Sequence, residues 1–274
     1  MIKAIFLDID GTIISIRRHA IPQSTMEAIR EVRRAGIKVF LCTSRAKQFM
    51  ANIHGIEADG MVCLTGANCV DADGTDISCA TMYPTDVAQA IGFVQTHNLP
   101  LVGIASRHIY IHLPQHPAVR NSFATGGLTL SDIGPYSDFP DLAHAANPEE
   151  TATRLGIMQF TAYCLPGKEE ERFLTLMPHC HTERWTTPFV DIVGNGTNKA
   201  LGIEVMARHF GFDPTETMAV GDGYNDVPMI EVAAIGVAMG NASDEVKRHA
   251  DYVTADVDAD GLSQALRRFA LKQS

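Results

Sequence analysis

The chain has 274 residues, with 22 Lys and Arg against 32 Asp and Glu, which gives a formal net charge of −10. Hydrophobic residues make up 46% and charged residues 20%, a balance that excludes a disordered chain. The negative charge disfavours nucleic-acid binding through a broad basic face, and no apolar run approaches the roughly 18 residues that a membrane span needs. The length fits one large or two modest domains.

The N-terminal segment has the apolar character of a buried strand and ends in two acids. Asp8 and Asp10 lie inside what would be the apolar region of a signal peptide, so secretion is disfavoured. The six cysteines include no CxxC pair, which favours reduced thiols over a disulfide framework. We therefore expect a cytoplasmic protein.

The first third of the chain alternates short apolar runs with helical patterns. Ser24 and Glu27 have the spacing of a capping box, so a helix is predicted from near Ser24 to Gly36. A second helix is predicted after residues 43–45. The predicted strands of this region are residues 2–7, 37–42 and 61–64. This alternation is typical of a parallel α/β sheet.

The last third repeats the same alternation. Helices are predicted over residues 197–210, 243–249 and 262–271, and strands over residues 217–220, 235–239 and 252–253.

The middle of the chain has a different pattern. A helix is predicted over residues 85–96 and another around the acidic run 169–171, with strands at 101–105, 108–113, 157–163 and 181–185. These strands alternate more, as in an antiparallel sheet with one open face. The sequence therefore predicts an α/β fold: a Rossmann-like parallel-sheet core of residues 1–82 and 189–274, with an α+β domain of residues 83–188 inserted into it.

Acidic residues follow two of the predicted core strands. Asp8 and Asp10 end the first strand, and the segment GDGYND, which includes Asp222 and Asp226, follows the strand at 217–220. Functional groups in doubly wound sheets gather beyond the carboxyl ends of the strands. Carboxylates this dense repel one another unless a cation lies between them, and oxygen ligands suit Mg²⁺. A carboxylate can also attack phosphorus to give an aspartyl-phosphate.

Three further residues have the chemistry to bind a phosphoryl group. Thr43 and Ser44 follow the second predicted strand, where hydroxyl and backbone N–H groups can hold a phosphoryl oxygen. Lys199 lies in the first turn of a predicted helix, where a cation opposes the helix dipole. A phosphate or acid cluster facing Lys199 would account for this placement.

Two other acidic motifs are interpreted as structural. The segment 71–75 repeats the DxDGT pattern but has no long buried strand before it, and Asp-Gly there predicts a hairpin turn. The segment 256–261 resembles the start of a calcium loop, but Arg267 stands where that loop needs a glutamate, so a loop that caps the last helix is expected.

Four motifs in this order resemble those of the haloacid dehalogenase superfamily, in particular Cof-type phosphatases with a C2B cap. They are DIDGT at residues 8–12, the strand that ends in Thr43-Ser44-Arg45, Lys199, and GDGYND at residues 221–226. The resemblance covers the whole chain, including the position and length of the inserted cap. It implies a Mg²⁺-dependent phosphatase similar to bacterial sugar-phosphate phosphatases, in which the cap closes over the core and selects the substrate.

The resemblance also implies a role for each motif residue. Asp8 would be the nucleophile, and Asp10 would protonate the leaving oxygen and then activate water. Thr43 and Lys199 would bind the transferring phosphoryl group, with Ser44 and Asn225 as further substrate-binding residues. Mg²⁺ would be held by Asp8, the backbone carbonyl of Asp10, and Asp222. Asp226 would orient Lys199 or metal-bound water rather than bind the metal directly.

The sequence departs from the family pattern at two places. The family usually has Thr-Gly-Arg where this chain has Thr43-Ser44-Arg45, and serine lacks glycine's access to positive φ. The family often has Asn-Gly-Ala where this chain has Thr65-Gly66-Ala67. At Arg45, both phosphate binding and pairing with an acid are open interpretations.

The expected function is hydrolysis of a small phosphate ester, most simply a sugar phosphate. Two alternatives stay open: a phosphosugar mutase on the same core, and a non-catalytic protein that binds phosphate or metal. We expect a monomer that binds neither nucleic acid nor membrane.

Overall fold

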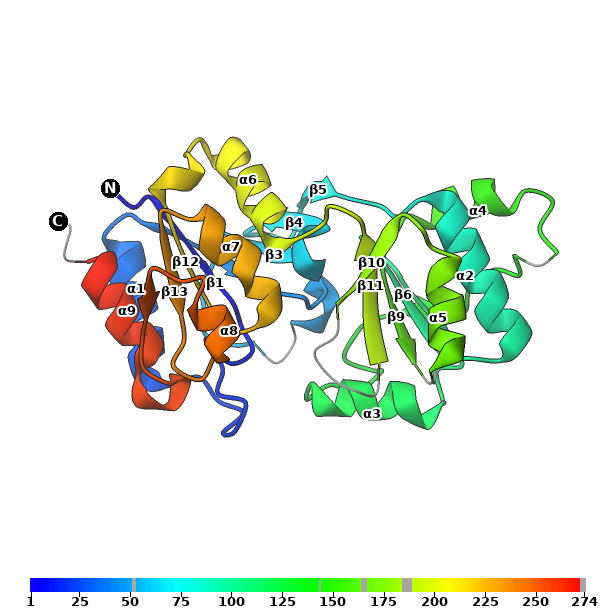
Figure 1. Ribbon diagram of the computed structural model, residues 1–274, viewed down its shortest axis with the longest axis horizontal. Helices are drawn as coiled ribbons and strands as arrows, with labels where there is room; N and C mark the ends of the chain where they lie inside the picture. The colour runs from blue at the N-terminus through cyan, green and yellow to red at the C-terminus, as the bar shows by residue number, and fades with distance from the viewer. Residues whose placement is uncertain (51–52, 143, 164–166, 184–188, 272–274) are drawn as a thin grey trace. The chain divides into compact units, whose positions relative to one another are not determined.

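The computed structural model describes residues 1–50, 53–142, 144–163, 167–183 and 189–271. The chain divides into two compact units (Figure 1). One unit, called the core, comprises residues 1–47, 53–78 and 198–274, and the other, called the cap, comprises residues 48–52 and 79–197. In the described residues, no helix is long and apolar enough to cross a membrane.

The core is built on one mixed sheet of eight strands. Their order is β14-β13-β12-β1-β2-β3-β4-β5, and every pair from β14 to β3 is parallel. The strands are β1 (Ala4–Leu7), β2 (Lys38–Cys42), β3 (Gly60–Cys63), β4 (Asn68–Asp71), β5 (Asp76–Cys79), β12 (Thr217–Gly221), β13 (Ile235–Ala238) and β14 (Tyr252–Val253). The central strand β1 is wholly buried, as its apolar composition predicts.

Helices cover both faces of the core sheet (Figure 1). On one face, α6 and α7 pack their apolar side chains against Phe6 and Phe40 of the two central strands. On the other face, α1 and α9 lie side by side. The core helices are α1 (Gln23–Arg34), α6 (Lys199–Phe210), α7 (Val227–Val232), α8 (Asp244–Lys247) and α9 (Gly261–Phe269), with short 3₁₀ turns η2 (Leu64–Gly66), η3 (Pro214–Glu216), η4 (Tyr224–Asp226) and η5 (Val257–Ala259). A further 3₁₀ turn, η1 (Lys47–Phe49), begins at the last core residue before the cap segment 48–52.

Two predictions about the first third of the chain are wrong. The residue before α1 is Pro22, and the Ser24 hydroxyl donates to Asp260 across 2.5 Å instead of forming a capping box. Among the described residues between β2 and β3 there is no α-helix after residues 43–45, and the short turn η1 lies there instead. The hairpin turn is confirmed, because the Gly74 N–H donates to the Asp71 carbonyl between β4 and β5.

The cap is built on a six-stranded sheet of order β10-β11-β9-β6-β7-β8, antiparallel except for the short pair β7 and β8. The helices α2, α4 and α5 lie on one face of this sheet (Figure 1), and their apolar residues pack in one cluster with Phe160. The elements are β6 (Leu101–Ala105), β7 (Ile109–His112), β8 (Tyr136–Ser137), β9 (Ile157–Tyr163), β10 (Cys180–Glu183), β11 (Phe189–Gly194), α2 (Pro84–His97), α3 (Pro117–Thr125), α4 (Pro148–Leu155) and α5 (Lys168–Thr175).

The observed boundaries between the units differ from the predicted ones. The inserted segment of the cap runs from residue 79 to residue 197, whereas the prediction was 83–188, and the short segment 48–52, predicted for the core, also belongs to the cap. The difference at the end of the inserted segment arises because β11 belongs to the cap sheet, where it pairs with β9 and β10. The apolar sequence of β11 would fit either sheet, so only this strand pairing shows that β11 belongs to the cap. Residues 184–188, which include the end of the predicted strand at 181–185, lie outside the described residues.

Candidate active site

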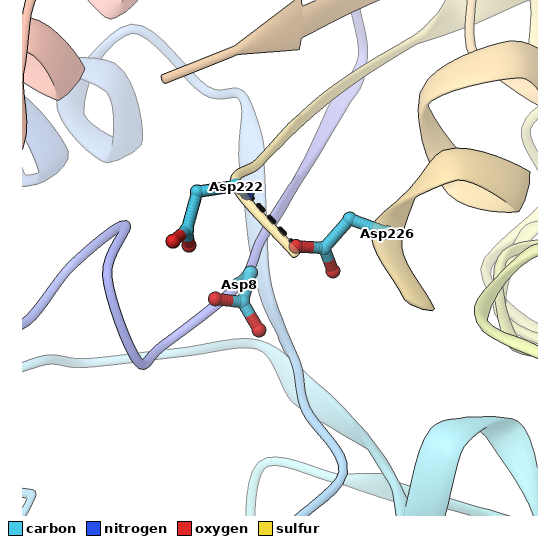
Figure 2. A group of neighbouring side chains, drawn as sticks. All are labelled: Asp8, Asp222 and Asp226. Atoms are coloured by element: carbon cyan, nitrogen blue, oxygen red, sulfur yellow. Dashed lines mark hydrogen bonds between the residues drawn. The ribbon is translucent and has the colours of Figure 1, made fainter. Parts of the chain in front are cut away.

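Three carboxylates gather where β1 and β12 end (Figure 2). Asp8 follows β1, while Asp222 and Asp226 belong to the turn after β12. One carboxylate oxygen from each of the three lies within 4.8 Å of the others. The strands β1 and β12 are parallel neighbours, so the sheet brings together two segments that are more than 200 residues apart in sequence.

Lys199 joins two of these carboxylates. Its Nζ donates to Asp8 Oδ1 at 2.7 Å and to Asp226 Oδ1 at 2.5 Å, and its side chain is fully buried. Asn198 caps α6 by accepting the Leu201 N–H, which fixes the first turn of the helix. The cost of placing a cation at this helix start is therefore offset by two buried ion pairs.

Asp226 holds the turn after β12 in shape. Its Oδ2 accepts the backbone N–H groups of Asp222 at 2.9 Å and of Gly223 at 2.8 Å. Figure 2 shows the bond from Asp222 as a dashed line. The Oδ1 atom of Asp226 accepts from Lys199. Both Asp226 oxygens are thus engaged by donors of the core, which suits an orienting residue better than a direct metal ligand.

The Asp222 carboxylate is held against the loop that follows β1. Its Oδ1 accepts from Thr12 Oγ1 at 2.9 Å, and its Oδ2 accepts from Asn241 Nδ2 at 3.1 Å. Asn241 also donates to the Gly11 carbonyl at 2.9 Å. Gly11 has φ +95°, and a Cβ there would lie 2.2 Å from Asp222 Oδ2, so only glycine permits this approach.

The loop that follows β2 contributes Thr43 and Ser44. Thr43 is buried, and its Oγ1 accepts the Arg45 N–H at 3.1 Å. Ser44 is half-buried and has no positive φ, so the conformational freedom of the family's glycine is not needed there.

The η2 turn beside this loop supports the start of α6. Thr65 takes φ +52°, a conformation that asparagine adopts more readily than threonine. A Cβ at Gly66 would lie 2.1 Å from the Asn198 carbonyl oxygen. This close approach places η2 directly against the residue before Lys199.

Asp10 has different surroundings from Asp8. Its carboxylate accepts two bonds from Arg45, Nε to Oδ2 at 2.8 Å and Nη2 to Oδ1 at 2.7 Å. Its side chain is 46% exposed, and it is not among the three carboxylates that converge. The structure therefore supports acid pairing at Arg45.

The electrostatics show that this site holds excess negative charge. Burial raises the pKa of Asp8 well above its usual value, and the Asp226 charge raises it further, against the opposing effect of Lys199. Burial and then Asp226 raise the pKa of Asp222 to about 7. Burial alone would lower the pKa of Lys199, but Asp226 and Asp8 outweigh it and raise that pKa. With all three carboxylates ionised, Lys199 would balance one of their three negative charges, and two further positive charges would be needed for neutrality.

The family model for haloacid dehalogenase-like hydrolases matches residues 5–266. The chain belongs to this family. It is a phosphatase of the haloacid dehalogenase superfamily, with the parallel core sheet of that fold.

Individual relatives cover almost the whole of this haloacid dehalogenase-like chain. YkrA of Bacillus subtilis is 30% identical over 98% of both chains, and the pyridoxal phosphate phosphatase YbhA of Escherichia coli is 28% identical over 96% of both. The solved structure of the subclass IIB sugar phosphatase BT4131 has a TM-score of 0.82 and 32% identity, covering 98% of this chain and 99% of that one.

Sequence reasoning missed two residues of this site, Thr12 and Asn241, which both donate to Asp222. Asn241 contacts both Asp222 and the loop after β1, and its Oδ1 accepts the Val257 N–H. The sequence signal for Asn241 was its position just beyond β13. The acids were identified by the same rule, that functional groups gather beyond the carboxyl ends of parallel strands. Of the predicted residues, the structure brings Asp8, Asp222, Asp226 and Lys199 together, whereas Asn225 is half-buried in η4.

Proposed function

We propose that the protein hydrolyses small phosphate monoesters, with Asp8 as the nucleophile and Mg²⁺ as the cofactor. The observation that carries the proposal is the buried Asp8 carboxylate, which is fixed by Lys199 and crowded by Asp222 and Asp226. A fold needs no such crowding of like charges for its stability, whereas phosphoryl transfer needs positive charge at this point.

The donor set fits Mg²⁺. Hard cations take oxygen ligands, and Asp8 and Asp222 offer carboxylates at the same place. We assign them as ligands together with the backbone carbonyl of Asp10, and we assign Asp226 the task of holding Lys199 and the 222–226 turn. When bound, Mg²⁺ would neutralise charge on phosphoryl oxygens and supply the positive charge that Lys199 alone does not.

The remaining residues bind the phosphoryl group and move protons. Lys199 Nζ, with the Thr43 hydroxyl and the Ser44 and Asn225 side chains, would hold phosphoryl oxygens. Asp8 would form a bond to phosphorus while the bond to the ester oxygen breaks. Asp10 would give that oxygen a proton, and it would later take a proton from the water that hydrolyses the aspartyl-phosphate.

Sugar phosphates are the proposed substrate class. Support comes from BT4131, a sugar phosphatase that this chain resembles over nearly its full length. YbhA is by name a pyridoxal phosphate phosphatase, which is why the test below includes phosphate esters other than sugar phosphates. The phosphatase names among the relatives favour hydrolysis over the mutase alternative.

The test is release of inorganic phosphate from a panel of sugar phosphates, nucleotides and 4-nitrophenyl phosphate. Each reaction is run with Mg²⁺, with EDTA, and with Asp8→Asn. We expect release that requires both Mg²⁺ and Asp8, with sugar phosphates ranked first by kcat/KM. Release that persists in Asp8→Asn would contradict the assigned nucleophile, and a ranking led by nucleotides would contradict the substrate class.

A further inference from the structure

Arg45 and Asp10 form a two-pronged ion pair between two loops of the core. Both carboxylate oxygens accept from the guanidinium, at 2.8 and 2.7 Å, and the Arg45 side chain is only 16% exposed. Such a fork fixes the orientation of a carboxylate as well as its charge, which a single hydrogen bond does not.

Each end of this pair is attached to a catalytic loop. The Arg45 N–H donates to Thr43 Oγ1, and the Arg45 carbonyl accepts the Leu64 N–H at 3.1 Å. On the other side, Asp10 lies beside Gly11, whose carbonyl and α-carbon are held close to Asn241 and Asp222. The pair thus connects the loop that presents Thr43 with the loop that presents Asp8.

We propose that Arg45 is a positioning residue that sets the Asp10 carboxyl group for proton transfer to the leaving oxygen. This inference rests on the proposed function, because it assigns Arg45 a part in the step given there to Asp10. A carboxylate has about four acceptor positions, and the guanidinium uses two of them. Asp10 can therefore keep both bonds to Arg45 while one of its oxygens faces the ester.

The proton balance of the step explains why a fixed cation is useful. The bond from phosphorus to the ester oxygen breaks, that oxygen takes the proton of the Asp10 carboxylic acid, and Asp10 is left as a carboxylate. Arg45 faces that new charge without moving, so no solvent has to reorganise around it. In the later hydrolysis, the same carboxylate takes the proton back from water.

A role in phosphate binding makes a different prediction. If Arg45 contacted the phosphoryl oxygens, its loss would weaken the reaction of every phosphate ester alike. If it acts through Asp10, the loss depends on how much the leaving oxygen needs a proton. A sugar alkoxide needs one, whereas 4-nitrophenolate leaves readily without it.

The experiment compares kcat/KM for a hexose phosphate and for 4-nitrophenyl phosphate in Arg45→Met. Because kcat/KM reports the steps up to departure of the leaving group, hydrolysis of the intermediate does not mask the difference. We expect the hexose phosphate value to fall by roughly 30- to 100-fold and the aryl ester value by less than about fivefold. Arg45→Lys keeps the charge but not the fork, so it should give an intermediate ratio.

Arg267→Met is the matched control. Arg267 of α9 makes a similar fork to Glu31 of α1, at 3.1 and 3.2 Å. Neither residue belongs to the cluster of Asp8, Asp222 and Asp226. The loss of Arg267 should leave kcat/KM unchanged for both esters.

Two results in Arg45→Met would overturn the proposal: equal losses of kcat/KM on the two esters, or no loss on either. If circular dichroism shows that Arg45→Met does not fold, Arg45→Lys tests the proposal instead, through the ratio of its kcat/KM losses on the two esters. Failure of the proposed function is separate, because it would appear in wild-type protein as release independent of Mg²⁺ or Asp8.

Discussion

The core and the cap both bury aspartates, but they use them in opposite ways. In the core, Asp8 and Asp226 are buried against each other with one lysine between them. In the cap, Asp86 accepts the His179 N–H at 3.0 Å and lies within 3.1 Å of His179 Nδ1, while Asp191 accepts from Thr161 at 2.6 Å. The cap acids are satisfied one by one, whereas the core acids are crowded.

The difference follows from how the two sheets are built. Parallel strands in the core deliver the residues after β1 and β12 to one edge, so acids from distant segments meet there. Antiparallel strands in the cap run in alternate directions, so consecutive loops leave at opposite ends. Among the described residues, the acidic group that could hold a metal ion lies in the core.

The largest expected effect tests this comparison directly, by changing one buried aspartate in each unit. Asp8→Asn should lower kcat by about 10⁴-fold or more, because it removes the attacking oxygen. Asp86→Asn should leave kcat within about threefold but lower the free energy of unfolding by about 1–3 kcal/mol, because it weakens the acceptor of the His179 bonds. Phosphate release and urea denaturation measure the two quantities. A large kcat loss in Asp86→Asn would show that the comparison is wrong.

The second effect concerns the only described cation that joins two of the crowded acids. Lys199→Met should lower kcat/KM by about 10²- to 10³-fold. It should also destabilise the metal-free protein by about 3–5 kcal/mol, since two buried carboxylates lose their shared partner.

Lys47→Met is the control for this variant. Lys47 pairs with Asp76 at 2.7 Å in the same unit but is partly exposed, so its loss should cost about 1 kcal/mol and leave activity unchanged. Equal destabilisation in both variants would argue against a special role for the Lys199 cluster.

Sequence reasoning predicted the parts of this molecule that depend on local pattern. Apolar runs gave the strands that end at the site, and the acids after them identified Asp8, Asp222 and Asp226. The same rule, applied after β13, would have identified Asn241. Positions were predictable here because a parallel sheet gathers its strand ends whatever the details of packing.

The parts that sequence reasoning missed depend on partners far away in the chain. The Ser24 hydroxyl bonds to Asp260, 236 residues later, so the local capping pattern was overridden. The assignment of β11 depends on pairing with β9 and β10. At Arg45, the choice between phosphate binding and pairing with an acid depended on where the Asp10 carboxylate lies, and no spacing in the sequence reveals that position.

A smaller effect is expected when a side chain that supports Asp222, the proposed metal ligand, is removed. Asn241→Ala deletes one donor to Asp222 and one to the Gly11 carbonyl. Mg²⁺ affinity should fall by about tenfold, which titration calorimetry measures, while saturating Mg²⁺ restores most of the activity. Asn68→Ala, which removes an amide that bonds to Asp76 and Ser78 in the same unit, should not change the affinity.

The last expected effect is on thermal stability rather than on activity, and it tests whether the crowding in the core is relieved by metal. Mg²⁺ at 100 times its dissociation constant should stabilise the folded state by about 2.7 kcal/mol, which corresponds to a rise in Tm of several degrees. Protons compete for Asp222, whose pKa is raised to about 7, so the rise should be smaller at pH 6 than at pH 8. Asp222→Asn should abolish most of the rise, whereas Asp86→Asn should lower Tm in both conditions and leave the rise itself intact. A rise in Tm that survives in Asp222→Asn would mean that Mg²⁺ stabilises the protein at another place. Mg²⁺ binding would then not relieve the crowding of the core acids, and the contrast with the cap acids would not affect stability.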